Sequence, residues 1–342
     1  MVMQTNPPDW RGQLRKNDRK TRWVIAVFIG LYVLVGLLVD CFVYNRMYGM
    51  RPEIVLQLIF SFRIIPYATL IMGGIAALSL LITYTFYDRL MLLGTEYVEV
   101  TRENARSMEE QQLYNVVEEM KVAAGLAYMP KVYIIEADYM NAFASGYSEK
   151  SAMVAITRGL IMKLDRAELQ AVMAHELSHI RHHDIKLTLT VAVLSNLMLM
   201  VVDLLFYSVL YTPRNDNEER RDNRLLIVIL VLRYVLPLLT VLLTLFMSRT
   251  RELMADSGCV ELTRNNEPLA RALMKISDDH SENADYYANE YTNTPHENVR
   301  RAAYIFDPVS AGLDAASASS SLFSTHPSLE ERLNALGYKR KN

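Results

Sequence analysis

The sequence predicts an α+β membrane protein in which four transmembrane helices accompany a mainly helical domain with a small β-sheet. Hydrophobic residues make up 51% of the 342-residue chain. Nearly charge-free stretches alternate with strongly charged ones, a pattern that soluble domains rarely show. Between the apolar stretches lie amphipathic runs with helical spacing and short runs rich in β-branched residues. The net charge of −2 says little by itself, and we expect no nucleic-acid partner.

The first apolar stretch, residues 23–39, contains no charged side chain. With Asp40 and the next four residues it reaches the roughly 20 residues that cross about 30 Å of hydrocarbon. A cleaved signal peptide is the alternative, but the apolar run is too long and no A-x-A cleavage site follows. Three further candidate spans follow at residues 64–87, 185–211 and 225–247.

The distribution of basic residues predicts the orientation in the membrane. Residues 1–22 form a basic tail that outnumbers the arginines of the next loop, so the N-terminus and residues 88–184 are predicted to be cytoplasmic. The loop between the third and fourth stretches carries four arginines, which leaves open a hairpin that only dips into the membrane. Asp203 and Arg233 inside these stretches are expected to face protein or a cavity rather than lipid.

These stretches also set the predicted domain boundaries. We expect a basic cytoplasmic tail, a first transmembrane pair, a domain in two parts, and a second transmembrane pair inserted between the two parts. The ranges are 1–22 for the tail, 23–87 for the first pair, 88–184 and 248–342 for the domain, and 185–247 for the second pair.

Local signals predict the elements of this domain. Asp165 is placed to cap a helix, Pro268 suits the first turn of another, and Ser328 with Glu331 forms a capping box before the last one. Residues 278–325 are polar and predicted to be mostly loop. Helices are predicted over 104–126, 165–183, 248–263 and 268–280, and strands over 131–136 and 151–157.

His175, Glu176 and His179 form an H-E-x-x-H motif on the helix predicted over 165–183. A separation of four places both imidazoles on one helix face, one turn apart, as chelation of a single cation requires. In this motif two neutral imidazoles hold Zn²⁺ and the glutamate acts as general base toward the attacking water. Such a short motif also arises by chance, so further residues in the chain must show whether it is a zinc site.

Catalytic zinc takes three protein ligands and keeps one open position, so a third ligand is expected. The metzincin extension needs glycine at position 182 and histidine at position 185, where this chain has His182 and Ile185. A carboxylate on a separate helix remains, and Glu252 is the best candidate. Asp256, one turn later, could fix a ligand histidine through its other ring N–H. Mn or Co could replace Zn in such a site.

Four motifs in the same order resemble the HtpX family of bacterial membrane zinc proteases, with the CaaX prenyl protease as a more distant relative. They are N-A-F-A-S-G at 141–146, H-E-x-x-H followed by Asp184, R-E-x-x-A-D at 251–256, and S-T-H-P-S-L-E-E-R-L at 324–333. The resemblance implies a zincin-like endopeptidase of the gluzincin type with one Zn²⁺ per chain. It also implies cleavage of membrane proteins, often misfolded ones, at the cytoplasmic face of the bacterial inner membrane. Its partners would be the lipid bilayer and unfolded polypeptides, and its role would be stress response and protein quality control.

The resemblance further implies a substrate-binding strand. Asn141, with Ala142 and Phe143, would lie at the rim of the substrate groove. There an exposed edge could pair with an extended substrate backbone. From the residues alone, an ordinary turn position is the alternative for Asn141.

The resemblance also places His326 and Arg332 near the scissile bond, as further catalytic residues. His326 could stabilise the oxyanion that develops in the transition state. Asp184, five residues after His179, corresponds to an acidic residue of the family and would support the ligands from the second shell. Arg332 could instead pair with a carboxylate of the fold, and Asp256 is the candidate partner.

Two other functions remain open. One is a catalytically silent membrane scaffold that keeps a zinc site, but a pure ligand site has no need of a glutamate at Glu176. The other is CaaX-type processing of a prenylated C-terminus, but that relative has more membrane helices and a much longer chain. Cleavage of a denatured membrane protein or of a prenylated peptide would separate the two enzymes.

Overall fold

The structure is a computed structural model. The chain divides into two units, which are described separately. The first unit comprises Met1–Arg19, Phe86–Thr188 and Thr244–Asn342, and the second comprises Lys20–Thr85 and Leu189–Leu243. The structure describes residues 10–86, 91–146, 148–183, 194–195, 198–204, 206–207, 223–294, 300, 303–307 and 326–338.

A four-stranded mixed sheet forms the centre of the first unit, in the order β1-β2-β4-β3. Its strands are β1 (Tyr97–Val100), β2 (Lys131–Ile135), β3 (Ala142–Ser145) and β4 (Met153–Thr157). Strands β2 and β4 are parallel, and the two outer pairs are antiparallel. The two predicted strands are confirmed as β2 and β4. Neither β1 nor β3 was predicted, because each has only four residues and β3 contains no β-branched side chain.

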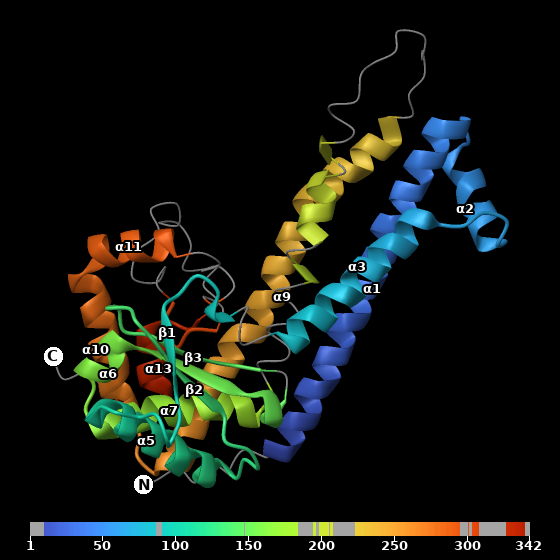
Figure 1. Cartoon of the computed structure of the whole chain (residues 1–342). Helices are drawn as coiled ribbons and strands as arrows, with labels where there is room; N and C mark the ends of the chain where they lie inside the picture. Colours follow the sequence, from blue (N-terminus) through green and yellow to red (C-terminus); the bar gives the residue numbers. More distant parts are fainter. Residues whose placement is uncertain are drawn as a thin grey trace. The chain divides into compact units, whose positions relative to one another are not determined.

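Helices α5 (Met108–Ala124) and α7 (Arg166–Arg181) pack against each other, and α7 also packs against β3 (Figure 1). Helix α10 (Glu267–Glu282) lies against α7 as well. The core joins these helices to one face of the sheet and includes Val132, Ile134, Val154, Ile156, Leu113, Val117, Leu169, Val172, Met173, Leu273 and Ile276. The predicted helices over 104–126, 165–183 and 268–280 are therefore confirmed.

Capping residues set where these helices begin. Asp165 accepts a hydrogen bond from the backbone N–H of Glu168, and the Glu168 side chain accepts from the N–H of Asp165, so the metal-motif helix α7 starts with a capping box. The predicted box at Ser328 begins α13 (Leu329–Ala335). Two short helices, α6 (Arg158–Lys163) and α11 (Ala284–Asn293), were not predicted.

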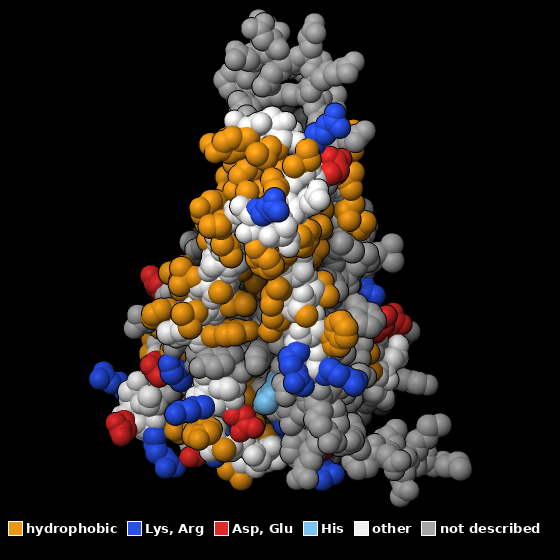
Figure 2. All heavy atoms as spheres, turned by 90° about the vertical axis from the view of Figure 1, so that its right-hand side faces the viewer, with side chains coloured by type: hydrophobic (Ala, Val, Ile, Leu, Met, Phe, Trp, Pro, Cys, Tyr) orange, Lys and Arg blue, Asp and Glu red, His pale blue; other side chains and the backbone are white. Residues whose placement is uncertain are grey.

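The second unit contains α1 (Trp10–Tyr48) from Lys20 onward, α2 (Pro52–Phe60), α3 (Tyr67–Thr85) and the first part of α9 (Asn223–Thr263). Within the described residues, one segment, Ile25–Asn45 of α1, is long and apolar enough to cross a membrane, and Tyr67–Ile82 is a shorter apolar helix. Hydrophobic side chains gather over the helices of this unit (Figure 2). Most of the predicted span at 185–211 lies outside the described residues, so the total of four spans stays a prediction.

Three charged residues of the second unit have partners within it, namely Asp40, Asp203 and Arg233. The buried Asp40 carboxylate of α1 accepts hydrogen bonds from the backbone N–H groups of Ala68 and Thr69 at 2.9 and 3.0 Å, and thereby caps α3. Arg233 lies 3.3 Å from Asp203, between its Nε and Oδ1 atoms. The Asp203 side chain is 51% exposed, so the expectation that it faces protein rather than lipid stays a prediction.

Helix α9 corrects the predicted break after residue 247. The helix predicted over 248–263 is not separate, because α9 continues from Asn223 to Thr263. Residues 244–252 contain neither glycine nor proline, so nothing in the chain ends the helix there. Pro237 lies inside α9 without ending it. The part from Thr244 onward belongs to the first unit and carries Glu252 and Asp256 into it.

Candidate metal centre

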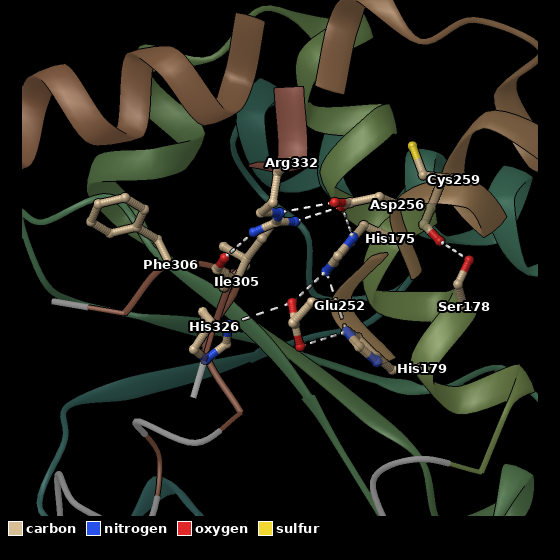
Figure 3. Close-up of polar contacts among 12 residues, drawn as sticks. His175, Ser178, His179, Glu252, Asp256, Cys259, Ile305, Phe306, His326 and Arg332 are labelled. Carbon is tan, nitrogen blue, oxygen red and sulfur yellow. Dashed lines mark hydrogen bonds and ion pairs between the residues drawn. The ribbon is translucent and has the colours of Figure 1, made fainter. Parts of the chain in front are cut away.

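Helix α7 brings the two histidines of the motif together. The Nε2 atoms of His175 and His179 lie 3.3 Å apart, and both residues are on the same face of the helix (Figure 3). His175 is fully buried. Two imidazole nitrogens at this distance are placed to bind one cation together.

Helix α9 supplies the third ligand candidate, Glu252. Its Oε2 lies 3.5 Å from Nε2 of His175, and its Oε1 lies 3.6 Å from Nε2 of His179. The candidate ligand atoms of the three residues all lie within 4.8 Å of one another. Glu252 is buried, and its Oε2 has no hydrogen-bond partner in the described part of the chain. Two imidazoles and one carboxylate are a donor set that zinc takes, so these residues fit the ion.

Small side chains allow α9 to approach α7 at this point. A Cβ atom added to Gly258 would lie 2.5 Å from Oγ and 2.9 Å from Cβ of Ser178. Ala255 and Cys259 on the same helix are fully buried, and the Cys259 thiol donates to the carbonyl of Ala171 at 3.2 Å. Cys259 is therefore a small packing residue and is not one of the clustered ligands. These small side chains let α9 lie close enough to α7 for Glu252 to reach the two histidines.

We expect Gly258→Ala to reduce both stability and metal binding. The new methyl group overlaps Ser178, so α9 must move away from α7, and overpacking of this kind costs about 1–3 kcal/mol. The measurements are the thermal unfolding midpoint and the zinc content per chain. Adding Ser178→Gly removes both overlapping atoms and should restore much of the metal content. Normal zinc content in Gly258→Ala alone would contradict the role of close packing.

Asp256 and Arg332 support His175 from behind the ligands. Nδ1 of His175 lies 3.0 Å from Oδ1 of Asp256. Arg332 donates from Nε and Nη2 to the two Asp256 oxygens at 3.0 and 2.6 Å, and from Nη1 to the carbonyl of Ile305 at 2.6 Å. The structure thus places Asp256 where it was expected. Arg332 is buried in a bidentate pair with Asp256, the alternative partner considered for it.

We expect Arg332→Met to destabilise the first unit strongly. Removing the guanidinium leaves the Asp256 carboxylate buried and without its cation, and breaking such a buried pair costs about 3–5 kcal/mol. Denaturant unfolding in detergent measures the loss. The matched control is Arg102→Met, which removes an exposed pair with Glu118, worth about 0–1 kcal/mol. If both substitutions lowered the free energy of unfolding equally, burial would not determine the strength of the Arg332–Asp256 pair.

The surroundings shift the pKa values of Glu176 and Glu252 in opposite directions. Burial raises the pKa of Glu176, and neither of its oxygens has a hydrogen-bond partner among the described residues. Burial also disfavours the charged form of Glu252, but the neighbouring His326, His179 and His175 outweigh it and hold the pKa of Glu252 well below its usual range. Glu252 is therefore suited to be a charged metal ligand, and Glu176 to be a proton acceptor.

His175 and Asp256 share a second electrostatic feature. Burial alone would lower the pKa of His175, but the carboxylates of Asp256 and Glu252 outweigh it and raise the pKa to about 9. Burial likewise opposes the charge on Asp256, and Arg332 outweighs it, so the pKa of Asp256 is lowered. In this structure the excess negative charge around the histidines therefore favours a cation between them.

His326 and Asp184 complete the predicted site residues of this region, and two further histidines follow the motif. His326 is buried beside the centre, with Nδ1 3.5 Å from Oε2 of Glu252. Asp184 lies outside the described residues. His182 is the C-cap of α7 and is not among the clustered ligands, and His183 follows it with a φ of 54°.

Asn141 does not lie at an exposed rim. It is fully buried, and its side-chain amide bonds Tyr291 and the backbone of Phe306. Ala142 and Phe143 are also buried, in the edge strand β3. The expected rim position is wrong for the Asn141 side chain, because its hydrogen bonds are made inside the protein. Sequence reasoning missed Tyr291 and the segment 304–306, since neither carries a motif.

Fold and site together define a metallopeptidase: an H-E-x-x-H helix packs on a mixed sheet, and a carboxylate from a later helix lies near both histidines. Residues 107–340 match Peptidase family M48, and the chain belongs to this family. It is 39% identical to "Protease HtpX homolog" of Helicobacter pylori (strain Shi470), over 94% of this chain and 96% of the relative. The protein of the same name from Dictyoglomus thermophilum (strain ATCC 35947 / DSM 3960 / H-6-12) is 35% identical over 82% and 87%.

Among solved structures, the crystal structure of S. mikatae Ste24p is similar, with a TM-score of 0.45 and 17% identity. The similarity covers 94% of this chain and 66% of that one.

Proposed function

We propose that the protein is a zinc-dependent endopeptidase anchored in a membrane, which cleaves membrane proteins, misfolded ones among them. One observation carries the proposal. Three ligand atoms converge within 4.8 Å, and the adjacent Glu176 is a buried carboxylate without a hydrogen-bond partner in the described part of the chain. A site that only stored metal would have no use for that second, costly buried acid.

The proposed chemistry is hydrolysis of a peptide bond. Zn²⁺ held by His175, His179 and Glu252 would act as a Lewis acid that lowers the pKa of water to about 7 and polarises the scissile carbonyl. Glu176 takes the proton from the attacking water and returns it to the leaving nitrogen. Burial raises the pKa of Glu176, which makes its carboxylate a stronger base toward that proton. We assign His326, beside Glu252, to stabilising the oxyanion.

The location follows from the apolar segments. Ile25–Asn45 would anchor the chain, and the three further stretches would complete four spans in the bacterial inner membrane. The basic tail would then place the site on the cytoplasmic side. This topology puts residues 181–186 and 248–252 at one membrane interface. Single cysteines at positions in both segments should react with a reagent added from the cytoplasmic side only, and labelling from opposite sides would refute it.

The test of function uses the full chain purified in detergent. It is loaded with zinc and incubated with a denatured membrane protein and, separately, with a prenylated peptide. We expect internal cleavage of the membrane protein, its loss on chelation and its return with added zinc. Cleavage of the prenylated peptide alone would indicate CaaX-type processing. Stoichiometric zinc without any cleavage would indicate a silent scaffold.

A further inference from the structure

Helix α3 of the second unit begins beside the apolar segment of α1 and not beyond its end. The Asp40 carboxylate of α1 accepts hydrogen bonds from the N–H groups of Ala68 and Thr69 and from the Thr69 hydroxyl, at 2.9, 3.0 and 2.8 Å. Gly36 of α1 lies against the same turn, because an added Cβ would be 2.6 Å from Cα of Thr69. At a rise of about 1.5 Å per residue, Asp40 lies about 8 Å inside the Asn45 end of the candidate span. The first turn of α3 therefore starts at about that depth.

Helix α2 contacts the same part of α1 (Figure 1). Val55 and Ile59 of α2 are buried with Cys41 of α1, and Tyr44 of α1 packs against this cluster. The Tyr44 hydroxyl also donates to the carbonyl of Ile65, in the connection between α2 and α3, at 3.0 Å. Both α1 residues lie within the candidate span. The connection from α2 to α3 is thus held beside the apolar segment.

Neither α2 nor the apolar part of α3 is long enough to cross a bilayer by itself. At about 1.5 Å per residue, Tyr67–Ile82 extends about 24 Å, which is short of the roughly 30 Å of hydrocarbon. Helix α2 has only nine residues. The two helices together supply the missing length, so the second crossing is a helix interrupted at residues 61–66. The interruption then lies near the boundary of the hydrocarbon.

The turn that ends α2 has backbone donors paired within the protein. The N–H groups of Phe62 and Arg63 donate to the carbonyls of Ile59 and Leu58, at 3.0 and 2.9 Å. This is the Schellman arrangement, in which the residue after the C-cap takes a left-handed conformation and is usually glycine. Here that residue is Phe62, with a φ of 56°. Internal pairing is what an interrupted helix needs at the edge of the hydrocarbon, where water is scarce.

Residues 60–67, which we call the apolar turn, present large apolar side chains to their surroundings. The exposed ones are Phe60, Phe62, Ile65 and Tyr67. Phe62 is 96% exposed, although an aromatic residue is unfavourable both in water and in a left-handed conformation. Arg63 within the turn and Arg51 just before α2 are exposed as well. Apolar rings beside arginines suit the boundary between acyl chains and phosphate, where a long basic side chain can reach the headgroup.

We propose that the apolar turn is a lipid-binding surface, which inserts Phe60, Phe62 and Ile65 into the leaflet at the Asn45 end of α1 and places Arg63 at the phosphates. The proposal rests on the membrane anchoring proposed above. Phospholipid is the partner that the observations favour, because the turn continues the apolar surface of α1 and carries cations that match phosphate. The inserted turn fixes the depth of the helices that it joins.

The test uses nitroxide spin labels on the full chain, reconstituted in vesicles of phosphatidylethanolamine and phosphatidylglycerol. Both native cysteines are buried, so single new cysteines can be labelled. Phe62→Cys and Ile65→Cys probe the turn. Leu34→Cys, at an exposed position of the candidate span, is the lipid control, and Met108→Cys, at the exposed start of α5, is the water control. Collisions with oxygen, which concentrates in lipid, are compared with collisions with a water-soluble nickel complex.

We expect the labels at Phe62 and Ile65 to give an oxygen-to-nickel ratio nearer that of Leu34 than that of Met108. A ratio like that of Met108 overturns the proposal, because the turn would then lie in water. Protection from both reagents also overturns it, because a protein surface, such as a second copy, would then cover the turn. If Leu34 itself met the nickel complex, the proposed membrane location would fail as well. No cleavage is measured, so a failure of the proposed proteolysis would leave this result unchanged.

Discussion

Glu176→Gln is expected to abolish measurable proteolysis while the protein keeps its metal. The substitution preserves the shape of the side chain but removes the group that accepts the proton of the attacking water, and general base catalysis contributes about 10²–10⁴-fold. Glu176 is not one of the three clustered ligands, so zinc content should stay at that of the unmodified protein. Replacing a buried, unpartnered carboxylate by a neutral amide should also raise the thermal midpoint slightly.

The assay measures kcat on a denatured membrane protein, together with zinc per chain. The matched control is Glu118→Gln on the surface of α5, where Glu118 pairs with Arg102 at 3.3 Å. Its kcat should be unchanged. Full activity in Glu176→Gln would remove this glutamate from the mechanism. Loss of activity together with loss of zinc would mean that Glu176 acts on the metal site itself.

Glu252→Gln is expected to remove the metal rather than only the chemistry. The carboxylate faces both histidines at 3.5 and 3.6 Å, and its charge is what favours a cation there. Removing one neighbour of a ligand lowers metal affinity about 10–100-fold, so loss of a ligand's charge should cost at least the upper end of that range. The protein should then lose zinc on dialysis and lose activity in parallel.

Zinc titration with a competing chelator measures this affinity. Glu261→Gln is the matched control on the same helix, because Glu261 pairs with Arg181 at 3.3 Å and touches no clustered ligand. Its zinc affinity should equal that of the unmodified protein. If Glu252→Gln retained zinc as tightly as this control, the third ligand would have to be sought elsewhere.

Helix α7 shows how far local signals reach. Three signals lie within 16 residues of the sequence, and the structure reproduces each of them. They are the capping box at Asp165 and Glu168, the apolar spacing of the helix, and the four-residue separation of His175 and His179. The capping box at Ser328 behaved in the same way. Interactions between near neighbours in the chain depend little on the rest of the fold, which is why sequence reasoning succeeds with them.

Strand β3 and helix α9 show where local signals stop. The Ala-rich strand β3 has low strand propensity, and it exists because β4 and the segment at Tyr304 pair with it. The break expected after residue 247 is missing, since a change from apolar to charged side chains does not end a helix that lacks glycine and proline at that point.

By itself, the sequence determined the H-E-x-x-H helix, the candidate ligand Glu252, the apolar stretches and the family resemblance, because each depends on spacing or composition along the chain. Only the tertiary structure decided that Arg332 pairs with Asp256, and that Asn141 is buried and bonded to Tyr291 and Phe306. Arg332 and Asp256 lie 76 positions apart in the sequence. Asn141 lies 150 positions from Tyr291 and 165 from Phe306. No local pattern encodes a pairing over that distance. It is set when the helices and the sheet bury their apolar faces together and each enclosed polar group must find a partner.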